Sequence, residues 1–527
     1  MKGPDRRLTR ALAGIGAAAA ALVPISNPDL FWHLSAARWI FQHRAIPSRD
    51  WLSARAGAPW ADFEALSQVV FGALEALGGT AALWCFKVAL FLGVLRAVDL
   101  AARDTKAPEA WRDAGVSLCA AALLTASDLR PDLFSVLAFT LTLRLVERAR
   151  RGEGAPRAWA LGALFCVWAN LHAGFAYGLA LVALYTVLGG FPWRVALAAP
   201  AGALLTTAPI RQFEVLWEHA RDRAVLTRYI AEWAPLRLSD PRALPHFALI
   251  ALSLVALGWV AARRRIAPAH ALLLLWLGYS GTQHGRLGVY FAVAAAVVIP
   301  QLLGEFSRAL PLALTVLATG FAAFGAGRMG LGEGAVYWQR FPMRAAAFLA
   351  EEAPTLGAKA MYNPWHWGGV LGWRLHPPYR VMMDGRYIFH DVLPQEAAAH
   401  RAPRAWQAWL DAQRVDLALL PTQGAEVPLI TRRPDGSLTR ARAPYYMAFM
   451  PPQAWALVAW DEVAMVWVRR ASVPPAWLAS REYVALRPGL SPEASLALRG
   501  PLDPRVTAAE TARHEASLRR YAPGAPE

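Results

Sequence analysis

Charged residues are scarce in this chain, and their scarcity argues against a wholly soluble protein. Only 17% of the 527 residues are Asp, Glu, Lys or Arg, whereas soluble domains contain about 25%. Hydrophobic residues make up 56% of the sequence. The long apolar runs lie almost entirely in residues 1–327, and residues 328–527 have a mixed composition. We therefore expect a transmembrane domain, 1–327, followed by a soluble C-terminal domain, 328–527.

Cysteine is rare, and the usual catalytic signatures are missing. Cys85, Cys119 and Cys166 lie inside apolar segments without CxxC spacing, so the sequence supports neither a disulfide framework nor a zinc site. No P-loop, GxSxG, HExxH or Rossmann GxGxxG motif stands in a convincing context. The net charge of +16 comes largely from arginines in short gaps between apolar runs. Without a basic stripe of interleaved aromatics, this charge does not indicate nucleic-acid binding.

The chain does contain a long series of apolar segments. A membrane span needs about 20 apolar residues, and about eleven segments approach this: 8–25, 67–97, 112–127, 131–149, 157–171, 174–191, 193–210, 244–262, 267–283, 286–303 and 308–327. The basic start of the first segment also suits a cleavable signal peptide. We favour an uncleaved span, because so many further spans follow.

The distribution of Lys and Arg orients these segments. With the N-terminus inside, the six inner connectors carry four, four, five, one, three and one basic residues. Each short outer connector carries one or none, and the two long outer loops carry four and six at lower density. The positive-inside rule favours this orientation. Two long outer loops, 25–66 and 209–245, result, and residues 328–527 lie outside, in the periplasm of a Gram-negative cell. The second loop contains an amphipathic segment that suits a helix on the membrane surface or, alternatively, a packing helix.

The first outer loop carries an Asp–His pair beside the membrane. Asp29 directly follows the first span, where a carboxylate is costly unless it is hydrated or paired. It could take a proton from a hydroxyl acceptor or bind a divalent cation; alternatively it caps the following helix. His33 lies four residues later, on the same helical face, where it could orient or assist Asp29. Trp32 suits the head-group layer and is a candidate substrate contact.

Asp62 and Glu64 close the same loop just before the next span. They could assist Asp29 or hold a cation. They are equally well explained as solvated charges at a helix start, where the helix dipole favours acids.

Three outer connectors each carry one ionisable group, namely Arg130, His172 and Arg286. Such groups beside apolar spans are candidates for function. The forked donors of arginine suit a phosphate, and the alternative for each arginine is snorkelling to the interface. In this topology all three lie on the outer face, as Asp29 does.

The C-terminal region alternates short apolar runs with a helical pattern. YRVMMDGR, VDLALLP and WALVAWDEVAMVWVRR read as strands, and AAAHRAPRAWQAWLDAQ reads as a helix, which predicts a small α/β domain. Trp365 and His366 precede paired glycines and suit a sugar or peptide platform. Asp384 and Arg386 are further candidate substrate contacts, although a turn explains the Asp-Gly pair as well.

These features together resemble the GT-C superfamily, whose members are integral-membrane glycosyltransferases that use polyprenyl-phosphate-linked sugars. The shared features are an acid after the first span, a long aromatic first loop, many spans and an outer C-terminal domain. PDLFWHL, WANLHAGF and WGGVLGW, with the later DGR, are similar to segments of largely uncharacterised bacterial membrane proteins beside that superfamily. The resemblance implies that Asp29 is a base or metal ligand, with Asp62 or Glu64 as a second acid.

We therefore expect an α-helical, polytopic, GT-C-like enzyme of the bacterial inner membrane. It moves a sugar from a polyprenyl-phosphate donor to an acceptor at the outer face, for the cell envelope. Its expected partners are the lipid-linked sugar and membrane lipids, and the acids allow a divalent cation as cofactor. The alternatives are a non-catalytic lipid-binding or scaffold protein of envelope assembly and, less favoured because no inverted repeat is evident, a transporter.

Overall fold

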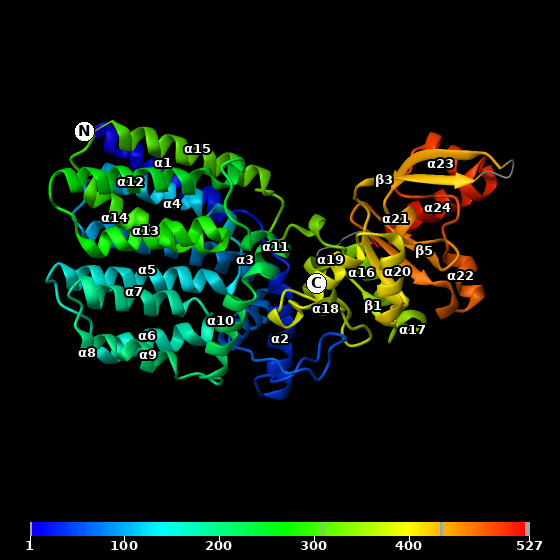
Figure 1. The fold of residues 1–527 in the computed structure, drawn as a ribbon, viewed down its shortest axis with the longest axis horizontal. Helices are drawn as coiled ribbons and strands as arrows, with labels where there is room; N and C mark the ends of the chain where they lie inside the picture. The colour runs from blue at the N-terminus through cyan, green and yellow to red at the C-terminus, as the bar shows by residue number, and fades with distance from the viewer. Residues whose placement is uncertain (1–2, 308, 433–435, 522–527) are drawn as a thin grey trace. The chain divides into compact units, whose positions relative to one another are not determined.

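Helices dominate the computed structural model, which describes residues 3–307, 309–432 and 436–521 (Figure 1). Residue 308, where the last predicted span begins, and the C-terminal residues 522–527 lie outside the described residues. The chain divides into two compact units. Unit 1 comprises Met1–Asn27, Ala36–Pro47 and Ala61–Tyr337, and unit 2 comprises Pro28–Ser35, Ser48–Trp60 and Trp338–Glu527. Two pieces of the predicted first outer loop, 25–66, thus belong to the same unit as the C-terminal region.

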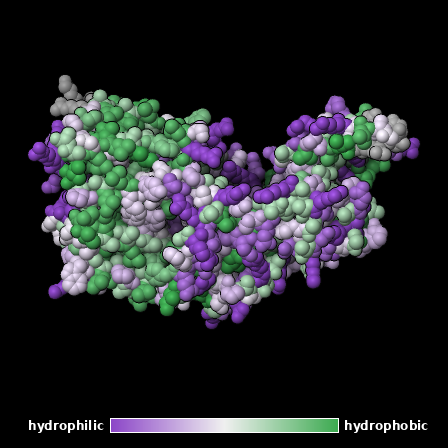
Figure 2. All heavy atoms as spheres, viewed as in Figure 1, coloured by the Kyte–Doolittle hydropathy of each residue, from purple (hydrophilic) through white to green (hydrophobic). Residues whose placement is uncertain are grey.

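Unit 1 is a bundle of apolar helices. Its main helices are α1 (Gly3–Ala21), α3 (Ala65–Asp104), α4 (Glu109–Ala122), α5 (Pro131–Arg150), α6 (Ala158–Leu171), α7 (Phe175–Leu188), α12 (Leu244–Ala262), α13 (Pro268–Gln283), α14 (Gly288–Leu302) and α15 (Leu310–Arg328). Helix α14 is apolar on all sides, and a helix of that kind belongs in the interior. Residues Gly288–Pro300 are accordingly all buried. Figure 2 shows hydrophobic side chains over much of the visible surface of this bundle.

Four helical segments in the described part of the chain are long and apolar enough to cross a membrane. These are Ala65–Asp104, Pro241–Ala262, Gly285–Leu302 and Leu310–Arg328. The predicted count of about eleven spans is therefore not confirmed. Residues 193–210 show one reason, because this predicted span is split into the short helices α8 (Trp193–Ala196) and α9 (Ala198–Ala203).

Residues 209–245, the second long outer loop of the predicted topology, are largely helical and belong to unit 1. It contains α10 (Arg211–Arg221), α11 (Arg223–Tyr229) and the short 3-10 helix η2 (Ala231–Trp233). Helix α10 is amphipathic, and Trp217 on it is 72% exposed. A second 3-10 helix, η4 (Gly285–Leu287), joins α13 to α14. These two 3-10 helices carry charged side chains of the candidate site.

Unit 2 contains a mixed four-stranded sheet with the order β1-β2-β6-β5. Strand β1 (Met361–Tyr362) is parallel to β2 (Leu417–Pro421), and β6 (Ala464–Arg469) pairs antiparallel with both β2 and β5 (Trp455–Trp460). Strands β3 (Glu426–Arg432) and β4 (Leu438–Pro444) form a separate hairpin. The surrounding helices are α16 (Met343–Glu351), α18 (Gly368–Leu375), α19 (Val392–Ala399), α20 (Pro403–Ala412), α22 (Pro475–Arg481), α23 (Pro492–Arg499) and α24 (Pro504–Arg520).

The predicted strands of unit 2 are found in part. VDLALLP contains β2, and WALVAWDEVAMVWVRR forms the β5–β6 pair. YRVMMDGR is not a strand, because it makes only one isolated parallel bridge, between Val381 and Ser53 of the first outer loop. The predicted helix after it is broken into α19 and α20, since proline at 403 favours the start of a new helix.

Candidate functional site

In unit 1, two arginines from distant connectors hold one carboxylate. Arg130 precedes α5, Arg286 lies in η4, and Glu232 lies in η2. Both terminal nitrogens of Arg130 donate to Glu232, with Nη2 at 3.2 Å from Oε1. Nη1 of Arg286 donates to the same Oε1 at 3.3 Å. The forked guanidinium of Arg130 thus holds both carboxylate oxygens, a geometry that also suits phosphate.

The charges of this cluster balance. Asp132, in the first turn of α5, lies 3.8 Å from Arg130 and 3.9 Å from Arg286. The partial burial of Glu232 raises its pKa, but the positive charges of Arg130 and Arg286 outweigh this effect and lower the pKa to about 2. Glu232 is therefore ionised at neutral pH, and the two arginines meet two carboxylates.

His172 lies beside this cluster, at the end of α6. The Trp168 indole N–H donates to Ser135 Oγ at 2.7 Å, and Ser135 Oγ lies 2.8 Å from His172 Nδ1. The Gly174 backbone N–H also donates to Nδ1, at 3.1 Å. Nδ1 is therefore an acceptor, which leaves the ring proton on Nε2. His172 Nε2 lies 3.7 Å from Glu64 Oε1.

The ionisation of His172 links it to the arginines. Burial, together with the positive charges of Arg286 and Arg130, holds the pKa of His172 well below its usual value. His172 is thus neutral at neutral pH and offers its Nε2–H as a donor. Unit 1 therefore brings together four of the predicted site residues, Glu64, Arg130, His172 and Arg286.

Asp62 adjoins this group as a structural partner of Glu64. It is buried and accepts hydrogen bonds from the Gln68 side chain at 2.8 Å and the Glu64 backbone N–H at 3.2 Å. Both contacts tie the Asp62 side chain to residues around the start of α3, whose N-cap residue is Glu64. Glu64, by contrast, directs its carboxylate toward His172.

Sequence inspection did not single out Glu232, Asp132 or Ser135. Glu232 lies in the outer loop among other acids, such as Glu214 and Glu218, and nothing in its local sequence marks it. Only its pairing with arginines about 100 and 54 positions away distinguishes it.

In unit 2, the residues Asp29, Trp32 and His33 occupy the first turns of α2 (Asp29–His43). His33 is buried, and its ring lies 3.6 Å from the ring of Trp32. Asp29 is partly exposed, and its Oδ1 lies 2.0 Å from the position that a Cβ would take on Gly385. The candidate carboxylate of the first loop thus packs directly against the Asp-Gly-Arg loop.

Asp384 and Arg386 are buried and paired with each other. Arg386 donates to Asp384 from Nε at 2.9 Å and from Nη2 at 2.7 Å, and its Nη1 lies 2.8 Å from Asp50 Oδ1. Arg386 is 2% exposed. The guanidinium also lies 5.0 Å from the centre of the Trp60 ring, within the range of a cation–π contact.

Trp365 and His366 lie in the short 3-10 helix η6 (Trp365–Trp367), directly before α18. Trp365 is half-buried, with its ring 6.2 Å from that of His390, and His366 is exposed. They remain candidates for an acceptor surface.

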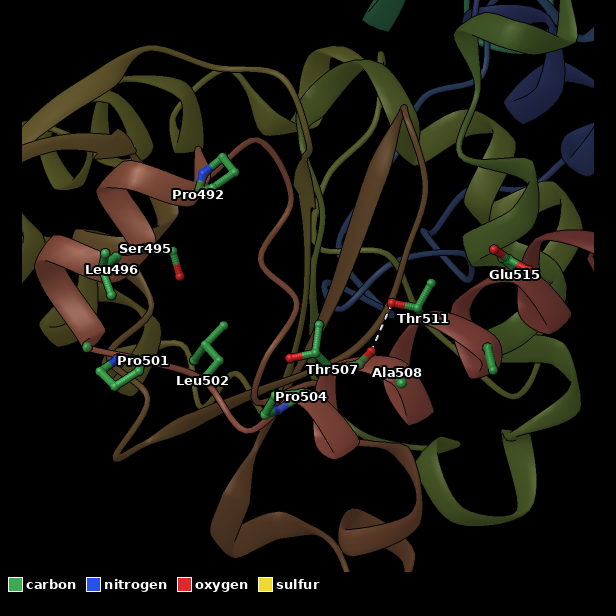
Figure 3. Close-up of a pocket in the computed structure, with 12 residues that line it drawn as sticks. Pro492, Ser495, Leu496, Pro501, Leu502, Pro504, Thr507, Ala508, Thr511 and Glu515 are labelled. Atoms are coloured by element: carbon green, nitrogen blue, oxygen red, sulfur yellow. Dashed lines mark hydrogen bonds between the residues drawn. The ribbon is translucent and has the colours of Figure 1, made fainter.

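Unit 2 also contains a shallow groove of about 750 Å³ between α23 and α24 (Figure 3). Its lining is mainly apolar, with prolines, leucines and alanines, and Glu515 is its one ionisable residue. It does not combine a base with a phosphate-binding cation, so we place the candidate chemistry elsewhere.

Comparison with known proteins yields structural likenesses only: no protein-family model and no curated protein sequence matches the chain. The oligosaccharyltransferase AglB of Archaeoglobus fulgidus, solved with an inhibitory peptide and a dolichol-phosphate, has 12% identity and a TM-score of 0.57, over 99% of this chain and 84% of that one. The same enzyme in complex with Zn and sulfate gives 13% identity and 0.54, over 98% and 83%. This chain has the GT-C fold. ArnT from Cupriavidus metallidurans, bound to undecaprenyl phosphate, is similar at 15% identity and 0.47, over 89% and 99%.

The GT-C resemblance raised the question of a divalent cation. Within the described ranges, no group of three or more His, Cys, Asp or Glu side chains is arranged to hold a metal ion. We therefore assign no step to a metal ion.

Proposed function

We propose that the chain is a membrane glycosyltransferase that moves a sugar from a polyprenyl-phosphate donor to an acceptor at the outer face of the inner membrane. The observation that carries the proposal is the Arg130–Glu232–Arg286 cluster. Two guanidinium groups from separate connectors converge on one anion, an arrangement that suits the phosphate of a lipid-linked donor.

In this proposal Glu232 occupies the place of the donor phosphate. Its carboxylate is planar and singly charged, whereas a phosphate offers more oxygens to the same forked donors. Glu232 is on a connecting segment outside the bundle helices, and such segments can move more readily than packed helices. When the donor binds, its phosphate replaces Glu232 between Arg130 and Arg286.

The proposal also assigns roles to Asp29, His172 and Glu64. Asp29, the first-loop acid of the resemblance, takes the proton from the acceptor hydroxyl. The acceptor oxygen then forms the new bond to the sugar, and the bond between the sugar and the phosphate breaks, so that polyprenyl phosphate leaves with the electron pair. Neutral His172 donates from Nε2 and, with Glu64, lines the donor position. We propose a cytoplasmic N-terminus and a periplasmic unit 2.

The test is turnover by the purified protein in lipid nanodiscs. The protein is incubated with a panel of undecaprenyl-phosphate-linked sugars and a cell-envelope extract as acceptor, and released undecaprenyl phosphate is measured by mass spectrometry. We expect release by the wild type and a loss of at least about 100-fold in Arg130→Gln/Arg286→Gln, because electrostatic contacts to a leaving group contribute several kcal/mol. Binding without release of any sugar would instead support the non-catalytic lipid-binding alternative.

A further inference from the structure

The Asp384–Gly385–Arg386 loop lies directly against Asp29 at Gly385. A Cβ placed on Gly385 comes within 2.0 Å of Asp29 Oδ1 and 3.3 Å of Trp32 Nε1. The backbone of Gly385 does not adopt a positive φ, so its conformation is open to other residues. A side chain at position 385 would therefore meet the Asp29 carboxylate first and push it aside.

Arg386 fixes this loop in place. It is almost fully buried and forms ion pairs with Asp384 and with Asp50 of the first outer loop. The Asp50 carboxylate also accepts a hydrogen bond from the Leu52 backbone N–H at 3.1 Å. Removing one partner from a buried charge pair leaves the other uncompensated at high cost. The buried triad therefore holds the loop and the 48–60 segment in one arrangement.

A second contact joins the same two segments. The Ala54 backbone N–H donates to Val381 O at 2.8 Å, three residues before Asp384. Arg55 further pairs with Asp391, at 2.6 Å, just after the loop. The segment that contains Gly385 is thus anchored to the first outer loop on both sides.

We propose that the Asp384–Gly385–Arg386 loop is a positioning element for the Asp29 carboxylate. Gly385 sets how closely the loop approaches Asp29, and Arg386 keeps the loop at that distance. Both are positioning residues, since they act through Asp29. The inference rests on the proposed function, in which Asp29 accepts the proton of the acceptor hydroxyl.

Gly385→Ala tests this inference, because the added methyl group must displace Asp29. Turnover is measured in nanodiscs with the donor that the wild type uses. We expect kcat to fall by about 100-fold, since a shift of about 1 Å in a reacting group has an effect of that size, while the KM for the donor changes less than about twofold. Gly327→Ala is the control, because its Cβ meets nothing within 4 Å.

The Asp29→Ala background separates positioning from general damage. Without the carboxylate the methyl group at position 385 keeps only its 3.3 Å approach to Trp32 Nε1, so Asp29→Ala/Gly385→Ala should be nearly as active as Asp29→Ala alone. If Gly385→Ala does not fold, Arg386→Lys replaces it, because lysine keeps the positive charge but loses the forked donors. We expect kcat to fall by about tenfold in this variant. That fall should again disappear in the Asp29→Ala background.

Each other outcome has a distinct meaning. If Gly385→Ala keeps its activity while Asp29→Ala loses it, the positioning inference is overturned and the proposed function stands. If Gly385→Ala lowers activity equally in both backgrounds, the loop has only a structural role and the inference is also overturned. If Asp29→Ala itself keeps full activity, the role of Asp29 in the proposed function fails.

Discussion

Replacing Glu232 with glutamine should tighten the binding of a polyprenyl phosphate. In the structure the carboxylate of Glu232 takes up donors of both Arg130 and Arg286. A phosphate that enters this site must first break these contacts. Glu232→Gln removes the competing negative charge while it keeps the size of the side chain, so the arginines are left ready for the phosphate.

The size of this effect follows from the contacts and their exposure. Hydrogen bonds to charged groups contribute about 1.5–3 kcal/mol each when they are buried. The Glu232 side chain is 37% exposed, so water screens the pairs and the contribution must be discounted. We therefore take about 1.4 kcal/mol as the free energy by which the Glu232 charge weakens phosphate binding. Removing that charge then lowers the Kd about tenfold.

The assay is the binding of a short-chain polyprenyl phosphate to protein in detergent, by isothermal titration calorimetry. Glu214→Gln is the matched control, because Glu214 lies in the same loop and pairs with Arg211 at 3.0 Å. It removes the same charge without touching the cluster, so its Kd should equal that of the wild type. An unchanged or weaker Kd in Glu232→Gln would show that Glu232 and the phosphate do not share a site.

Two further predictions concern the charges within each unit. Burial and the nearby arginines hold the pKa of His172 well below 6.5, so below about pH 6.5 the unfolded chain binds a proton that the folded chain does not. Stability should therefore fall as the pH falls through that range, and His172→Gln should make the fall in melting temperature shallower; an unchanged slope contradicts this assignment. Asp50→Asn should destabilise unit 2 by about 3 kcal/mol, because it breaks a buried pair, as measured by limited proteolysis on heating. Asp391→Asn, at an ion pair whose acid is 58% exposed, should change it by less than about 1 kcal/mol, and equal effects of the two variants would refute the distinction.

The helices of unit 1 could be predicted closely, because apolar runs and their boundaries are local features. The segment 244–262 has the bounds of α12, and 131–149 differs from α5 by one residue. Proline in the first turn and arginine in the last turn of α5 mark its ends. The span count is not confirmed, since helices such as α6 and α7 have only 14 residues each, fewer than the about 20 that a span needs.

The site could be predicted only in part, because much of it depends on residues distant in the sequence. Arg130, His172 and Arg286 were identifiable as isolated polar groups beside apolar segments. Glu232 was not, since its role comes from pairing with two of them across the fold. The segment YRVMMDGR likewise has a strand-like composition. However, its Val381 pairs with Ser53, more than 300 residues earlier, and nothing in the local sequence indicates this contact.

The most direct test of the account is a structure of the protein in nanodiscs with bound undecaprenyl phosphate. The account predicts a phosphate with oxygens about 3 Å from guanidinium nitrogens of both Arg130 and Arg286, and Glu232 moved out from between them. A phosphate bound elsewhere, with Glu232 still paired to the two arginines, would contradict it.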